Sequence, residues 1–135
     1  MRILAASASA LVAFSVLPSN AQQTPAPHSP TDTITVRLSN FAFAPDHLRL
    51  KAGVPLRLRL ENASNGGHDF SAPAFFAASL LPPGSPALSG GAVAVSAHQT
   101  LELDVMPRTP GTYRLECTHF LHSLFGMHGT IEVTP

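Results

Sequence analysis

The chain has 135 residues, a length typical of one domain, and its eight lysines and arginines balance eight aspartates and glutamates. This neutral balance argues against a nucleic-acid or anionic-membrane binder, because both carry a basic excess. With 44% hydrophobic and 12% charged residues the chain can bury a core, which excludes a disordered protein, and its single cysteine excludes an internal disulfide.

The N-terminus has the features of a secretory signal peptide. Arg2 precedes an apolar run from Ile3 to Leu17, and small residues at Ser19 and Ala21 favour cleavage after Ala21. A membrane anchor is the alternative, but this run of about 15 residues is shorter than the roughly 20 that span a bilayer. We therefore predict a signal peptide over residues 1–21, no stable membrane insertion after cleavage, and a location outside the cytoplasm, which in a bacterium is the periplasm.

A proline-rich polar leader precedes a long region in which apolar and polar residues alternate. Residues 22–30 (QQTPAPHSP) are typical of a flexible segment. From Thr31 onward, apolar residues recur at every second position, which predicts strands with one buried and one solvent-facing side. The clearest alternations, separated by turn residues, lie at residues 34–38, 48–50, 56–60, 101–105, 113–117 and 131–133.

One segment departs from this alternation. Residues 74–81 follow Pro73 and end at Pro82, and their composition predicts a short helix between strands. About seven or eight short strands in one domain indicate a β-sandwich or a small barrel. We expect the core to include Phe41, Phe43 and the apolar side chains of the helix, which are Phe75, Phe76, Leu80 and Leu81.

A stretch near the C-terminus combines a thiol, an imidazole and a thioether. Cys117, His122 and Met127 lie in CTHFLHSLFGM with the spacing Cys-x4-His-x4-Met, in the connection between the last two predicted strands. His68 follows an Asn-Gly-Gly turn, and because loops meet at the ends of a sandwich it can reach the same place. Two imidazoles, one thiolate and one weak thioether are the donors of a blue-copper electron-transfer site. A secreted protein whose only cysteine has no second cysteine for a disulfide also favours metal binding.

These motifs resemble those of the cupredoxins, the single-domain blue copper proteins. The resemblance runs from about Thr31 to Pro135 and rests on GGHDF, on PGTYRLEC, and on GMHG before the final strand; the ligand-loop spacing is rusticyanin-like. It implies an all-β, antiparallel Greek-key β-sandwich of about seven to eight strands, with one short helix, over residues 31–135. It also implies that one copper ion is held by His68, Cys117, His122 and Met127.

The resemblance implies a function as well. The chain would be a monomeric periplasmic type 1 copper protein, not an enzyme, that carries single electrons between redox partner proteins met weakly and transiently through an apolar patch around the ligand loop. A copper carrier or copper-resistance protein of the same fold is the alternative, although the mature chain offers only Met106 and Met127 for a methionine-rich surface. A Cys–His hydrolase is a third possibility, disfavoured because Cys117 lies at a strand end rather than at a helix N-terminus.

Three features depart from the family pattern or leave a choice open. Asp69 stands where cupredoxins often have asparagine, and a carboxylate beside a thiolate is unfavourable. His119 could compete with His122 as the second imidazole, although we expect it on the surface with His47, His98 and His128. The apolar helix could shield the metal end from water instead of packing in the core.

Overall fold

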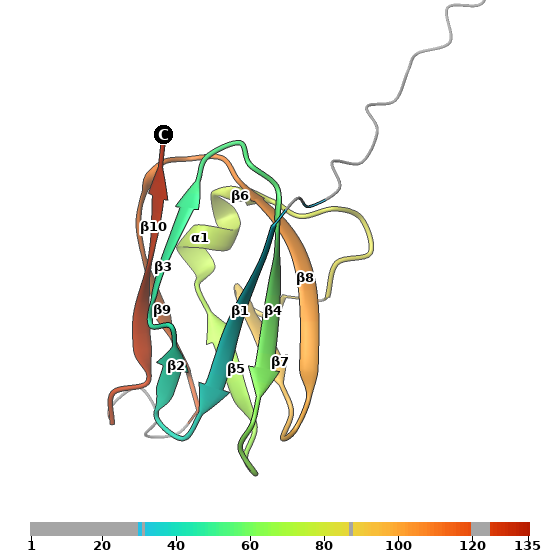
Figure 1. Cartoon of the computed structure of the whole chain (residues 1–135), viewed down its shortest axis with the longest axis vertical. Helices are drawn as coiled ribbons and strands as arrows, with labels where there is room; N and C mark the ends of the chain where they lie inside the picture. Colours follow the sequence, from blue (N-terminus) through green and yellow to red (C-terminus); the bar gives the residue numbers. More distant parts are fainter. Residues whose placement is uncertain (1–29, 31, 87, 120–124) are drawn as a thin grey trace, which may run out of the picture.

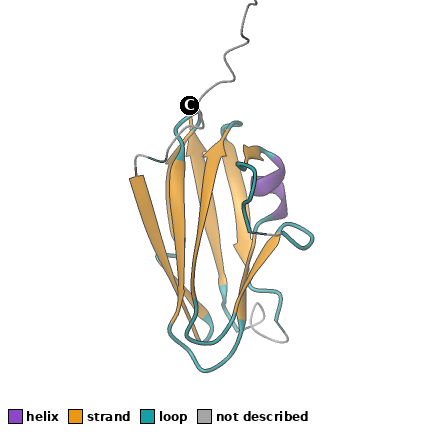
Figure 2. Cartoon of the chain, turned by 90° about the vertical axis from the view of Figure 1, so that its right-hand side faces the viewer, coloured by secondary structure: helices purple, strands orange, loops and turns teal. Residues whose placement is uncertain are grey.

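The computed structural model describes residues 30, 32–86, 88–119 and 125–135. Within these residues, ten strands and one helix build two five-stranded sheets that pack face to face (Figures 1 and 2). The predicted all-β sandwich with a short helix is therefore confirmed. The predicted signal peptide (1–21) and all of the predicted leader except Pro30 lie outside the described residues. No helix of the described part is long and apolar enough to cross a bilayer.

Each sheet combines strands from distant parts of the chain. The first has the order β2-β1-β4-β8-β6, formed by Ala42–Ala44, Asp32–Ser39, Leu56–Asn62, Thr100–Pro107 and Ser79–Leu80. The second has the order β3-β10-β9-β5-β7, formed by His47–Lys51, His128–Thr134, Gly111–Glu116, His68–Ser71 and Ala92–Val95.

The number and direction of the strands differ in detail from the prediction of about seven or eight antiparallel strands. Strands β1 and β4 run parallel, with Ile34 opposite Leu58, and so do β3 and β10, with Leu48 opposite Ile131. Alternation has the same period in both kinds of pairing, so it cannot reveal direction. The added strands lack a readable alternation, because β2 and β6 are very short, β5 is buried at every position and β7 is apolar throughout.

The core lies between the sheets and is centred on aromatic side chains. Phe70 is fully buried, and its ring contacts those of Phe43 and Phe76 at centroid distances of 6.0 and 6.1 Å. The prediction of a core position is confirmed for Phe43 but is wrong for Phe41, which is 45% exposed. Phe41 lies in the turn between β1 and β2 with a φ of 64°, so the alternation of β1 does not continue through it.

Helix α1 is shorter than its sequence suggests. It spans Pro73–Ala77, and its buried residues are Phe75 and Phe76. The prediction of a helix to Leu81 is wrong beyond this point, because Ser79 and Leu80 pair with β8 as strand β6. Leu80 is 46% exposed rather than in the core. In Figure 1, α1 lies towards the end of the sandwich that holds the C-terminus, whereas β9 ends and β10 begins at the other end, so α1 does not shield that end.

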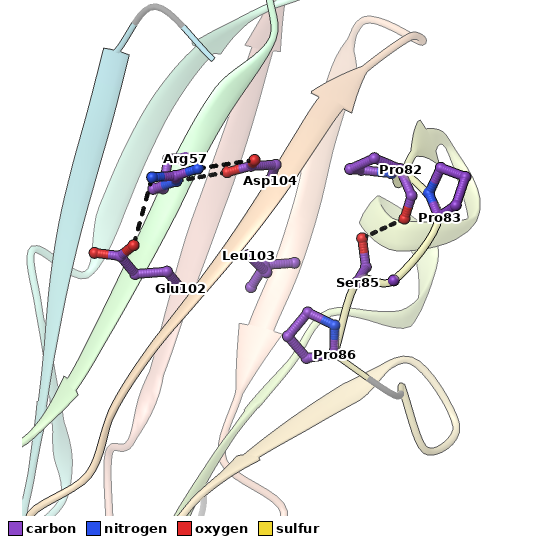
Figure 3. Close-up of a pocket in the computed structure, with 9 residues that line it drawn as sticks. Arg57, Pro82, Pro83, Ser85, Pro86, Glu102, Leu103 and Asp104 are labelled. Carbon is purple, nitrogen blue, oxygen red and sulfur yellow. Dashed lines mark hydrogen bonds and ion pairs between the residues drawn. The ribbon is translucent and has the colours of Figure 1, made fainter. Parts of the chain in front are cut away.

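A charged network covers the outer face of β4 and β8. Arg57 donates through Nε and Nη2 to the two carboxylate oxygens of Asp104, at 2.7 and 3.0 Å, and lies 3.5 Å from Glu102 (Figure 3). It borders a pocket of about 280 Å³ that the proline-rich segment 82–86 also lines. Because the guanidinium is already paired with carboxylates, we assign no ligand to this pocket.

The Arg57–Asp104 pair makes the folding stability of the protein depend on pH. The hydrogen bond from Arg57, helped by its charge, lowers the pKa of Asp104 below its ordinary value. A lowered pKa stabilises the fold above the unfolded-state value of about 3.9, and this gain is lost as the pH falls through the folded-state value. We expect Asp104→Asn to lower the melting temperature of the metal-free protein by about 3 °C at pH 7. The difference should shrink between pH 7 and an acidic pH below the folded-state pKa of Asp104.

Thermal unfolding followed by circular dichroism at both pH values measures this effect. Asp46→Asn, at an exposed carboxylate, is the matched control and should change the melting temperature equally little at both pH values. A deficit for Asp104→Asn that persists undiminished in acid would contradict the assignment.

Candidate metal centre

The structure brings His68 and Cys117 together from positions 49 residues apart in the chain. His68 begins β5, and Cys117 directly follows the end of β9, which pairs with β5 in the same sheet. The distance from His68 Nδ1 to Cys117 Sγ is 3.9 Å, and both residues are buried. Two of the four predicted ligands therefore lie close enough to share one metal ion.

The loop before His68 orients its imidazole. His68 Nε2 lies 2.8 Å from Ser64 Oγ, which in turn donates towards the carbonyl-type oxygens Asn62 Oδ1 and Gly66 O, at 2.8 and 3.0 Å. Because Ser64 has one hydroxyl proton and both of these oxygens only accept, we assign the proton of the neutral imidazole to Nε2. The lone pair of Nδ1 then faces Cys117, which is the tautomer that a metal ligand needs.

The backbone amides of Asp69 and His119 face the sulfur of Cys117. The amide of Asp69 donates to Sγ over 3.5 Å. Burial raises the pKa of the Cys117 thiol above its ordinary value, while the backbone hydrogen bonds from Asp69 and His119 act in the opposite direction. A buried thiol with a raised pKa stays protonated at neutral pH unless a cation holds the thiolate, and a protonated thiol is a poor nucleophile. This environment argues against the hydrolase alternative.

Of the other two predicted ligands, Met127 lies within the described residues and His122 lies outside them. Met127 is fully buried, and its carbonyl oxygen accepts a hydrogen bond from the Cys117 amide at 3.1 Å, which ties the start of the β9–β10 connection to its end. His122 lies outside the described residues, so its place as the second imidazole stays a prediction.

His119 and Asp69 belong to the centre more closely than the sequence indicated. His119 is 44% exposed, as expected for a surface residue, yet its Nδ1 lies 3.6 Å from Cys117 Sγ and 3.6 Å from Asp69 Oδ2. One ligand atom from each of Asp69, Cys117 and His119 lies within 4.8 Å of the other two. The available signal was adjacency, since Asp69 follows His68 and His119 lies two residues after Cys117. The remaining described histidines, His47, His98 and His128, are exposed as predicted.

The donors gathered at this end suit a soft metal ion. His68 Nδ1 and His119 Nδ1 lie 3.9 and 3.6 Å from Cys117 Sγ, and the buried Met127 accepts a backbone hydrogen bond from Cys117. Thiolate, thioether and imidazole are the ligands that copper selects, whereas magnesium and calcium select oxygen.

Comparison with known proteins identifies the class to which this chain belongs. The family model described as the cupredoxin-like domain matches residues 6–133. The chain therefore belongs to the cupredoxin family.

The particular relatives are auracyanins. Auracyanin-B of Chloroflexus aurantiacus is 31% identical over an alignment of 127 positions. The alignment covers 79% of this chain and 54% of that protein, so the chain spans about half the length of this relative. A crystal structure of auracyanin B has 28% identity and a TM-score of 0.59, covering 79% of this chain and 91% of that one.

Two more distant structures agree in fold alone. Dithionite-reduced auracyanin from Roseiflexus castenholzii has 18% identity and a TM-score of 0.60, covering 79% of this chain and all of the other. A multicopper oxidase from Campylobacter jejuni has 16% identity and a TM-score of 0.61, covering 90% of this chain and 34% of the oxidase.

Proposed function

We propose that this protein is a type 1 copper protein that binds one copper ion and carries single electrons between redox partners. The observation that carries the proposal is the buried approach of His68 Nδ1 to Cys117 Sγ, at 3.9 Å, between two strands of one sheet. His68, Cys117 and Met127 would hold the ion, with His122 as the second imidazole. Bound copper would supply a Cu(II)/Cu(I) couple that accepts and releases one electron.

The protein's part is to hold these donors in place and to keep water away from them. Ser64 fixes the ring of His68, and the amide of Asp69 is directed at Sγ. The Cys117–Met127 backbone hydrogen bond closes the connection between β9 and β10. Donors that are prearranged by strands and hydrogen bonds rearrange little when an electron moves, which is what an electron carrier requires.

The relatives support the same proposal. The auracyanin structure from Roseiflexus castenholzii is that of the dithionite-reduced protein, and it shares only the fold with this chain. The support therefore comes from membership of the cupredoxin family and from the 31% identity to auracyanin-B. We propose an equivalent redox change for this chain, together with export by the signal peptide at 1–21 to the periplasm, where the mature protein acts as a monomer.

Loading the purified mature protein with Cu(II) and recording its visible and paramagnetic resonance spectra tests the proposal. An intense band near the red end of the visible range is expected, since it reports a Cu(II)–thiolate bond. Reversible voltammetry then separates an electron carrier from the alternative, a copper carrier or resistance protein of the same fold. A colourless Cu(II) adduct with no thiolate band would contradict the type 1 assignment.

An exposed aromatic pair at the same end of the sandwich offers a contact surface for transient partners. The rings of Phe41 and Phe125 meet edge to face at a centroid distance of 5.5 Å, and the two residues are 45% and 61% exposed. Phe41 lies in the β1–β2 turn, which Figure 1 places at the end where β10 begins. Large exposed aromatic side chains favour brief association through apolar contact.

We expect the double variant Phe41→Asn, Phe125→Ser to exchange electrons between its own Cu(I) and Cu(II) forms about tenfold more slowly, because one apolar contact of about 1.4 kcal/mol is lost in the encounter. Asparagine is chosen because it tolerates the positive φ at position 41. Nuclear magnetic resonance line broadening measures this rate. Leu80→Ser, at an exposed leucine near α1, is the control and should leave it unchanged; an equal loss there would remove the patch from the proposal.

A further inference from the structure

Asp69 is a buried acidic residue in β5, directly after His68, and it contacts the segment that follows the end of β9. Its side chain is 10% exposed, and its backbone amide donates to Cys117 Sγ. Carboxylate Oδ1 accepts from the Thr118 amide at 2.6 Å, and Oδ2 accepts from the Thr118 hydroxyl. Acceptance at both oxygens is the pattern of an ionised carboxylate, so a negative charge is held beside the sulfur.

This charge is close to the atoms that would contact the metal. A carboxylate oxygen of Asp69, Cys117 Sγ and a ring nitrogen of His119 all lie within 4.8 Å of one another. The carboxylate cannot swing out to water without breaking both bonds to Thr118, which itself adjoins Cys117. The segment that holds Cys117 therefore also fixes the position of the Asp69 carboxylate.

We propose that the Asp69 carboxylate lowers the reduction potential of the copper centre, and this inference rests on the proposed function. When the centre takes one electron from a donor, Cu(II) becomes Cu(I) and the site loses one positive charge, while Asp69 forms no new bond and exchanges no proton. A fixed negative charge at this distance, shielded from water, stabilises the more positive Cu(II) state more than Cu(I).

The side chain that cupredoxins often have at this position provides the comparison. Asparagine has the shape of aspartate, and its carbonyl can accept from the Thr118 amide while its NH₂ donates to the Thr118 hydroxyl. Both links to Thr118 can survive in Asp69→Asn, and the charge alone is removed. The effect of the Asp69 charge on the copper centre can therefore be measured separately from the effect of its hydrogen bonds to Thr118.

The test is voltammetry of the copper-loaded protein at fixed pH and ionic strength. Asp69→Asn is expected to keep the visible band and to raise the potential by at least about 59 mV, which is a tenfold change in the ratio of Cu(II) to Cu(I) affinity. The matched control is Glu116→Gln, which removes the same charge one residue from Cys117 but from a partly exposed side chain paired with Arg114 at 2.8 Å. Its potential should shift by less than a third as much, because solvent screens it.

A second variant keeps the result decisive. Asp69→Ser also removes the charge, and it serves if the asparagine variant fails to fold or to hold copper. An unchanged or lower potential in a variant that retains the band would overturn the inference while leaving the proposed function intact. Loss of the band in both variants would also overturn it, by showing that the carboxylate is needed to build the centre. Absence of the band in the unaltered protein would instead defeat the proposed function.

Discussion

Cys117→Ser is expected to abolish the intense visible absorption of the Cu(II)-loaded protein and to weaken Cu(I) binding by more than about 100-fold. The band requires a thiolate bonded to Cu(II), and a serine hydroxyl is a hard, protonated donor that Cu(I) does not favour. Loss of a residue that merely supports a metal ligand weakens binding by about 10- to 100-fold, so removal of the ligand itself should exceed that range. Titration with a Cu(I) chelator, alongside the visible spectrum, measures both effects.

The control for this variant is the stability of the metal-free protein. Cys117 is fully buried, so a serine there places a hydroxyl among apolar and amide groups at a cost of about 1–3 kcal/mol. Cys117→Ala avoids the buried hydroxyl, leaves only a small cavity in place of the sulfur, and should still fold while losing the band equally. A serine or alanine variant that retains the absorption would show that the copper is bound elsewhere.

His122→Ala is expected to lose the type 1 spectrum, whereas His119→Ala retains it. The prediction follows from the Cys-x4-His-x4-Met spacing, in which His122 is the imidazole that matches the cupredoxin pattern. His119 is nearly half exposed and can lose its ring without opening the core. Added imidazole should restore the band to His122→Ala, because a free imidazole can enter the space left by the removed ring. Visible and paramagnetic resonance spectra of the two variants, with and without imidazole, decide the assignment.

The position of His119 in the structure is the reason for comparing the two histidine variants. The ring of His119 lies 6.4 Å from that of His68 between centroids, and its Nδ1 is slightly nearer to Cys117 Sγ than that of His68, at 3.6 against 3.9 Å. Loss of the spectrum in His119→Ala, with His122→Ala unaffected, would make His119 the second imidazole and contradict the site as predicted from the sequence.

The class of the fold and the kinds of donor were determined by the sequence alone. Strands such as β1 and β4 could be predicted because side chains at every second residue face the same side of a strand. This alternation can be recognised without knowing the partner strand. Cys117, His122 and Met127 could be grouped because they lie in one short segment. A single cysteine close to a histidine and a methionine in the sequence indicates a metal ligand by its chemistry.

What the tertiary structure decided concerns pairs that are distant in the chain. The parallel pairing of β1 with β4 and the bonds between Asp69 and Thr118 depend on strand order and register. The sequence predicted that His68 and Cys117 share a site, but their 3.9 Å approach depends on strand order and register as well. The exposure of Phe41 likewise depends on the turn between β1 and β2 rather than on alternation. Local patterns record which face of a strand is buried, but contacts across 49 residues arise only when the sheets assemble, so no pattern of neighbouring residues encodes them.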